Sequence, residues 1–109
     1  MKVLLINGSP HKKGCTYTAL HEVETTLQQN GIETEMLYLG KAPIPGCIAC
    51  MNCMTTGFCF QKDIVRDIQM RLDEFDGIVI GSPVYYSAPT GQLISFLNRL
   101  FFATEQRMA

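Results

Sequence analysis

The chain has 109 residues, a formal net charge of −1 and an apolar content of 47%. This length fits one domain, residues 1–109, and the apolar content can form a hydrophobic core, which excludes a disordered chain. The sequence contains no basic block and no acidic tail, so its charge gives no support for binding nucleic acid or a membrane surface. It also shows no signal-peptide pattern and no membrane-spanning apolar run, and we therefore expect a cytoplasmic protein.

The first part of the chain predicts a strand, a loop and a helix. Residues 3–6 form an unbroken apolar run, which is typical of a strand buried on both faces. The glycine-rich residues 8–14 predict a loop. We expect Thr16 to cap the helix that follows and Asn30-Gly31 to end it in the left-handed conformation. The apolar stripe of this helix is expected at Leu20, Val23 and Leu27.

The middle of the chain predicts a second strand, a long loop and a second helix. Residues 32–39 begin with alternating apolar and acidic side chains, which suits an edge strand. Residues 41–62 predict an irregular loop that carries four of the five cysteines. We expect Asp63 to cap or open the next helix. The apolar side of that helix is expected at Ile64, Ile68 and Leu72.

The last part predicts a third apolar strand at residues 78–80, a loop to residue 91 and a helix over residues 91–102. Strands that alternate with helices predict an α/β fold with a parallel sheet. Because the two fully apolar strands belong together, we expect strand order 2-1-3, the beginning of a flavodoxin-like three-layer sandwich whose later strands are missing.

The third strand is apolar for an edge strand, and the last helix has an apolar face too wide for packing on one side. Both features predict a partner, which is either the rest of a truncated domain or a second chain. The apolar residues of the last helix are Leu93, Ile94, Phe96, Leu97, Leu100, Phe101 and Phe102.

Two loops follow the carboxyl ends of the first and third strands, where ligands bind in this strand order. In the first loop, Ser9 and Thr16 offer hydroxyl groups, and the helix N-terminus adds positive potential, which favours an anion. In the second loop, residues 81–90, backbone amides can bind the edge of a planar ring while Tyr85 and Tyr86 pack beside it. The alternatives are a simple connecting turn and two half-buried tyrosines.

The four clustered cysteines are separated by two, two and five residues, a spacing that can bring four thiolates around an iron–sulfur cluster or a zinc ion. Unligated or partly oxidised thiols and a pair of disulfides are the alternatives, although a reducing compartment and an odd number of cysteines disfavour disulfides. From its place in the chain, we expect the cysteine run near the carboxyl ends of the strands. The four residues are Cys47, Cys50, Cys53 and Cys59.

The segments GSPHKKGCT and GSPVYYSAPTGQLISFLNRL resemble the phosphate loop and the ring-binding loop of the NAD(P)H-dependent FMN reductase family, in the flavodoxin-like superfamily. The cysteine run resembles that of its iron–sulfur flavoprotein branch. Members of this branch form dimers or tetramers, and they continue through two further strands and two helices that also contact the flavin.

The resemblance implies that FMN is the cofactor and that its phosphate is held by Ser9, Cys15 and Thr16. It implies that the flavin ring is bordered by Pro83, Val84, Tyr85 and Tyr86. It implies further that a 4Fe–4S cluster is ligated by Cys47, Cys50, Cys53 and Cys59. From the residues alone, Cys15 is either a reactive thiol at a helix N-terminus or a small residue whose backbone amide matters.

The leading hypothesis is an FMN-dependent oxidoreductase that passes electrons from NAD(P)H through FMN to an acceptor, with the cluster as a candidate relay. Because the cofactor carries this chemistry, we expect no catalytic acid–base pair. The alternatives are a non-catalytic FMN-binding electron carrier or fragment, and a zinc-stabilised interaction domain.

Overall fold

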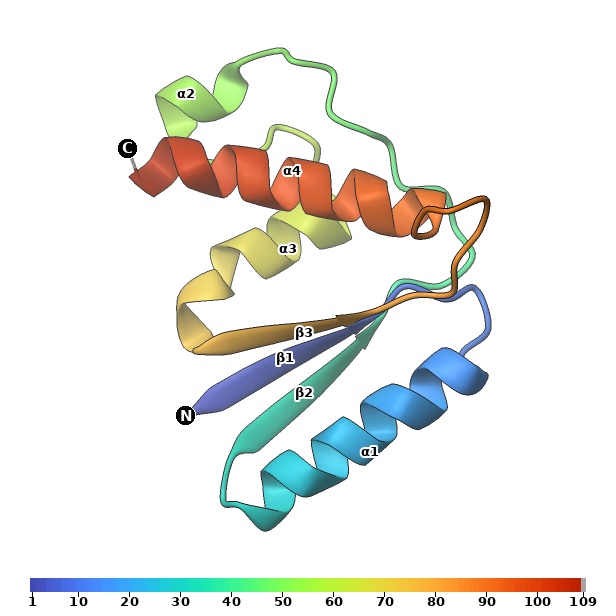
Figure 1. Cartoon of the computed structure of the whole chain (residues 1–109). Coiled ribbons are helices and arrows are strands. Elements are labelled where there is room, and N and C mark those ends of the chain that lie inside the picture. Colours follow the sequence, from blue (N-terminus) through green and yellow to red (C-terminus); the bar gives the residue numbers. More distant parts are fainter. Residues whose placement is uncertain (109) are drawn as a thin grey trace.

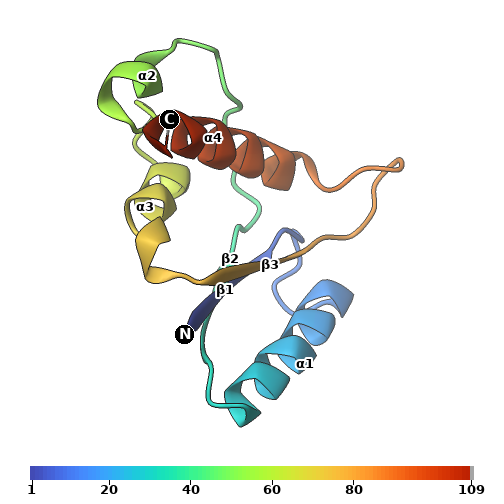
Figure 2. The same ribbon diagram turned by 60° about the vertical axis from the view of Figure 1, so that its left-hand side comes forward.

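A computed structural model describes the backbone of residues 1–108 and the side chains of residues 1–105. Its parallel sheet has the strand order β2-β1-β3. Helix α1 covers one face of the sheet, and α3 and α4 lie on the other (Figures 1 and 2). This arrangement confirms the flavodoxin-like α/β fold. The elements are β1 (Lys2–Asn7), α1 (Cys15–Gln29), β2 (Glu33–Tyr38), α2 (Asn52–Thr56), α3 (Ile64–Met70), β3 (Gly77–Gly81) and α4 (Gly91–Met108).

The central strand β1 is buried on both faces, as its unbroken apolar run predicts. Leu4 and Ile6 pack with residues of α3 and α4, including Val65 and Phe96. Successive side chains of a strand point to opposite faces, so the neighbouring Val3 and Leu5 pack with Leu20 of α1 instead. The sheet therefore separates two apolar clusters.

Strand β3 lies at an edge of the sheet among the described residues, paired with β1 alone. Ile80 of β3 is 42% exposed, and Ile94 and Phe101 of α4 are 37% and 48% exposed. The apolar excess that the sequence predicts on the third strand and the last helix is thus present on the surface. None of the helices within residues 1–108 is long and apolar enough to cross a membrane.

Helix α1 begins one residue before the predicted cap. Its N-cap is Gly14, whose extended backbone lets its carbonyl oxygen accept hydrogen bonds from the Thr18 amide and hydroxyl. The prediction that Thr16 caps the helix is therefore wrong, because Thr16 lies inside the first turn. Val23 is also exposed, contrary to prediction, whereas Gly31 has the predicted left-handed backbone, with φ of 77°.

Helix α3 confirms the predicted cap but not the whole predicted stripe. The Asp63 carboxylate accepts a hydrogen bond from the Val65 amide at 3.1 Å, which fixes the first turn. Val65 and Ile68 are the buried apolar residues, and Leu72 belongs to the short 3-10 turn that follows the helix. Helix α4 continues to Met108, past the predicted end at residue 102.

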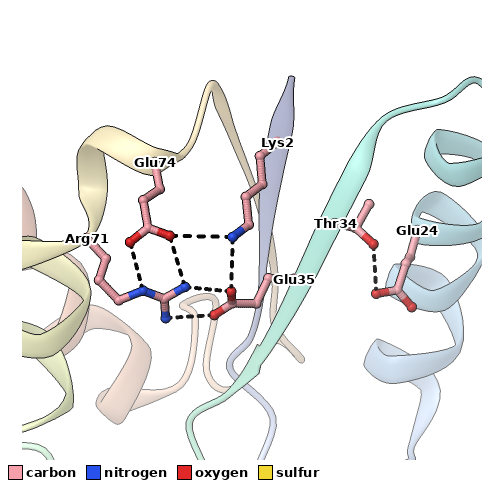
Figure 3. A network of polar contacts seen from close by, with 6 residues as sticks. All are labelled: Lys2, Glu24, Thr34, Glu35, Arg71 and Glu74. Carbon is pink, nitrogen blue, oxygen red and sulfur yellow. Dashed lines mark hydrogen bonds and ion pairs between the residues drawn. The ribbon is translucent and has the colours of Figure 1, made fainter.

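A network of charged side chains joins β1, β2 and the turn after α3 (Figure 3). Arg71 donates two hydrogen bonds to the Glu35 carboxylate, at 2.9 and 2.6 Å, and also pairs with Glu74 at 3.2 Å. Lys2 Nζ lies 3.6 Å from Glu35 and 3.5 Å from Glu74. The hydrogen bonds from Arg71 are the main cause that lowers the pKa of both glutamates.

Two glycines at the carboxyl ends of β1 and β3 lie close under side chains of the helices. The Gly8 amide donates to the Gly81 carbonyl oxygen at 2.9 Å. A Cβ atom on Gly8 would lie 2.8 Å from Leu93 Cδ2, and one on Gly81 would lie 3.0 Å from Leu20 and Thr16. A larger residue at either position would therefore crowd a helix on one face of the sheet.

We predict that Gly8→Ala lowers the free energy of unfolding by about 1–3 kcal/mol, because the added methyl group overpacks the contact with Leu93. Gly91→Ala is the matched control, since a Cβ atom at Gly91 meets no heavy atom within 4 Å. Chemical denaturation of both variants measures the difference. Equal stability of the two variants would contradict the prediction.

We predict that Glu35→Gln weakens the acid dependence of stability. A carboxyl whose pKa is lower in the folded state stabilises the fold above its ordinary pKa of 4.5, and this contribution is lost as the pH falls through the folded-state pKa. The melting temperature of the variant should therefore fall less steeply in acid than that of the unsubstituted protein. The control is Glu33→Gln, at an exposed position of β2. If the melting temperatures of both variants and of the unsubstituted protein fall equally in acid, this account is refuted.

Candidate functional site

The two predicted ligand-binding loops begin at the same end of the sheet, where β1 and β3 have their carboxyl ends (Figure 1). Besides the Gly8–Gly81 hydrogen bond, the buried Thr90 hydroxyl donates to the Gly8 carbonyl oxygen at 2.6 Å. Ser82 Oγ in turn accepts from the Thr90 amide at 3.0 Å. The bases of the two loops are thus held together by direct hydrogen bonds.

The first loop is shaped by three side chains. Asn7 is 1% exposed; its Oδ1 accepts from the Ser9 amide at 3.0 Å and its Nδ2 donates to the Lys12 carbonyl at 3.3 Å. The Tyr38 hydroxyl donates to the Pro10 carbonyl at 2.7 Å. Ser9 is buried, and its Oγ accepts from the His11 amide at 3.0 Å. Sequence reasoning missed Asn7, although a polar residue that ends a buried apolar run is a visible signal.

This loop leads into a helix N-terminus that no side chain caps. The first amides of a helix have no acceptor within the helix, and their dipoles favour an anion. Cys15 and Thr16 contribute two of these amides; Cys15 is exposed and Thr16 is half-buried. The exposed Lys12 and Lys13 add positive charge. The arrangement fits a phosphate group.

The second loop carries a tight turn with an unusual backbone. Tyr85 and Ala88 exchange two backbone hydrogen bonds, at 2.8 and 3.1 Å, around Tyr86 and Ser87. Both central residues have positive φ, 51° and 63°, a conformation that favours glycine and asparagine. Such strain in residues other than glycine concentrates at ligand sites. Tyr86 is fully exposed, so the turn presents an uncovered aromatic ring.

The other predicted ring-contacting residues belong to the same loop. Val84 is 75% exposed and Tyr85 is 50% exposed, whereas Pro83 is half-buried at the base of the loop. An exposed apolar and aromatic segment beside a loop that fits a phosphate group also fits the planar ring of a nucleotide-like cofactor.

The predicted irregular loop 41–62 contains a short helix, α2, which sequence reasoning missed. Cys53 lies on α2 and is buried, Cys59 is half-buried, and Cys47 and Cys50 are exposed. All four line one small pocket together with Arg99, Phe102 and Ala103 of α4. The pocket volume is about 20 Å3, room for roughly one water molecule. Burial is the main cause that raises the pKa of Cys53, and the neighbouring thiols add to it.

The structure therefore gathers the four predicted ligands around one pocket. Their chemistry, four thiols, fits a soft metal or an iron–sulfur cluster. Within the described part of the chain, however, no three His, Cys, Asp or Glu side chains are arranged to hold a metal ion.

The cysteine pocket does not lie beside the second loop, which corrects the expected position. The chain after β2 follows α4 away from the sheet: Gln92 donates to the Gly40 carbonyl at 3.2 Å, and Arg99 to the Pro45 carbonyl at 3.0 Å. Helix α2 lies near the carboxyl end of α4, whereas the second loop lies at the amino end of α4 (Figures 1 and 2). At 1.5 Å rise per residue, residues 99–103 are about 12–18 Å along α4 from its start.

Two buried polar residues beside the cysteines were missed by sequence reasoning. Gln69 of α3 accepts from the Cys59 amide at 3.1 Å and donates to the Gly57 carbonyl at 3.0 Å. Arg99 of α4 has a fully buried side chain that pairs with Asp63. Burial opposes its charge, but hydrogen bonds to Asp63 and Cys59 outweigh this and raise its pKa above the ordinary value.

The chain is similar to known proteins along its whole length. The family model of NADPH-dependent FMN reductases matches residues 1–109. An iron–sulfur flavoprotein of Methanocaldococcus jannaschii is 37% identical over 91% of this chain and 51% of its own length. An iron–sulfur flavoprotein of Archaeoglobus fulgidus is 32% identical over 92% of this chain and 46% of its own length. An iron–sulfur flavoprotein of Clostridioides difficile is 32% identical over 97% of this chain and 48% of its own length.

The chain spans about half the length of these curated relatives, namely 51%, 46% and 48%. The match to the family model nevertheless extends over both loops and the cysteine segment. The chain belongs to the NADPH-dependent FMN reductase family.

Proposed function

We propose that this protein is an FMN-dependent oxidoreductase that accepts electrons from NAD(P)H and delivers them to an acceptor. The observation that carries the proposal is that two loops meet at the carboxyl ends of β1 and β3. One loop leads into an uncapped helix N-terminus, and the other carries a strained, exposed tyrosine turn. When bound, FMN supplies the hydride and single-electron chemistry, and the protein binds and orients it.

In this proposal, the residues of the first loop hold the FMN phosphate. The first-turn amides of Cys15 and Thr16 donate to it, and the hydroxyl groups of Thr16 and Ser9 are further donors. The hydrogen bonds of Asn7 and Tyr38 keep the loop in shape before the ligand arrives. A loop that is already ordered loses less conformational entropy on binding.

The second loop holds the flavin ring. Pro83, Val84, Tyr85 and Tyr86 supply apolar and aromatic contacts, and free amides of the loop bind the polar edge of the ring. Because Thr90 ties this loop to Gly8, the ring-binding and phosphate-binding segments keep a fixed spacing. This spacing selects a ligand that carries both groups.

We further propose that Cys47, Cys50, Cys53 and Cys59 ligate a 4Fe–4S cluster. The position of all four thiols around one pocket and the similarity of the chain to iron–sulfur flavoproteins support this assignment. Four thiolates also suit zinc, and the metal content of protein purified without oxygen distinguishes iron with sulfide from zinc. The free thiols are consistent with a reducing, cytoplasmic compartment.

The exposed apolar surface of β3 and α4 fits a second copy of the chain, in a dimer or a tetramer, and it fits equally a further part of a longer chain. The second candidate function is a non-catalytic FMN-binding electron carrier. Oxidation of NAD(P)H by the FMN-loaded protein, faster than by free FMN, distinguishes the enzyme from the carrier.

We predict that the double variant Thr16→Val with Tyr85→Ala binds FMN at least about tenfold more weakly, because it loses a hydrogen bond to phosphate and an aromatic contact. Titration with quenching of flavin fluorescence measures the affinity. The control is Thr26→Val with Met70→Ala, which alters the same residue type on α1 and an exposed apolar side chain of α3, outside both loops.

The control variant should bind FMN like the unsubstituted protein. Unchanged affinity in the Thr16→Val, Tyr85→Ala variant would count against the proposed FMN site.

A further inference from the structure

The Arg99 side chain is buried in the middle of α4 and lines the cysteine pocket. Its guanidinium makes a bidentate pair with the Asp63 carboxylate, at 2.7 and 2.8 Å. Its Nε is buried with no hydrogen-bond partner among the described residues. Buried unpaired donors are rare in folded proteins and call for a specific explanation.

The same guanidinium holds both ends of the cysteine segment. Nη1 donates to the Pro45 carbonyl at 3.0 Å, two residues before Cys47, and Nη2 donates to the Gln61 carbonyl at 3.3 Å, two residues after Cys59. All four cysteines of the run lie between these two attachment points. One side chain of α4 thus closes the segment into a loop.

Arg99 also contacts one of the cysteines directly. Nη2 lies 3.5 Å from Cys59 Sγ, within hydrogen-bond distance for sulfur. The Cys59 amide is bound by the buried Gln69. Cys59 is therefore held from α3 through its backbone and from α4 through its sulfur, whereas Cys47 and Cys50 are exposed.

We propose that Arg99 is the positioning residue of the cysteine site, which places Cys59 Sγ as the fourth thiolate ligand of a bound metal. This inference rests on the thiolate-metal part of the proposed function. A hydrogen-bond donor to a metal ligand fixes the orientation of that ligand.

The test is titration of reduced, metal-free protein with Co²⁺, whose absorption reports tetrahedral thiolate coordination. We predict that Arg99→Gln weakens Co²⁺ binding by about 10- to 100-fold, because this is the usual effect of removing a hydrogen-bond partner of a metal ligand. The variant should also show weaker thiolate-to-cobalt absorption. Arg71→Gln is the matched control, because Arg71 also forms a bidentate pair with a carboxylate, but within the network of Figure 3. This control should bind Co²⁺ like the unsubstituted protein.

A double-mutant cycle with Cys59→Ser separates positioning of the sulfur from a general effect on the fold. If Arg99 acts through Cys59, Arg99→Gln causes little further weakening once Cys59 is serine. Equal weakening in both backgrounds, or none in either, overturns the inference while leaving the thiolate site in place. No Co²⁺ binding by the unsubstituted protein overturns the thiolate site and the inference together.

Should Arg99→Gln fail to fold, Arg99→Lys serves in the same cycle. Lysine keeps the positive charge but lacks the planar group that reaches Asp63, the two carbonyls and Cys59 together. It is predicted to weaken Co²⁺ binding only when Cys59 is present, and equal effects with and without Cys59 contradict the proposal.

Discussion

The hydrogen bond between Gly8 and Gly81, at 2.9 Å, brings the carboxyl ends of β1 and β3 into direct contact, and both candidate binding loops depend on this contact. Leu93 packs over one side of the junction, and Leu20 with Thr16 packs over the other, so a side chain larger than hydrogen at either glycine would be crowded. Thr90 then ties the second loop to Gly8. The spacing between the uncapped N-terminus of α1 and the exposed aromatic turn is therefore set by backbone packing at the end of the sheet.

Helix α4 connects this site to the cysteines. Its first turn follows the second loop, and Arg99, about 12 Å further along, binds both ends of the cysteine segment. A buried ion pair such as Arg99–Asp63 adds little net stability compared with apolar packing, because desolvation offsets the attraction. Its effect is to fix one arrangement of the segments it joins. The second loop thus lies at the amino end of α4, and the cysteine pocket lies near its carboxyl end (Figure 1).

Patterns that depend on neighbouring residues could be predicted from the sequence, and long-range contacts could not. The apolar run of β1, the Asp63 cap and the left-handed Gly31 follow from local chemistry, and the strand order follows from which strands are fully apolar. The Thr16 cap was wrong because the extended Gly14 supplies the first helical carbonyl in its place. Arg99 was missed because its partners lie 36–54 residues away in the sequence, and the same contacts carry the cysteine run away from the strand ends.

The central claim is that FMN binds across the two loops at the carboxyl ends of β1 and β3. A crystal structure of the chain grown with FMN tests this most directly. The account predicts density for the phosphate at the amides of the first turn of α1, with the flavin ring against residues 83–86. Density for the flavin at another surface, or a ring placed away from the tyrosine turn, would contradict it.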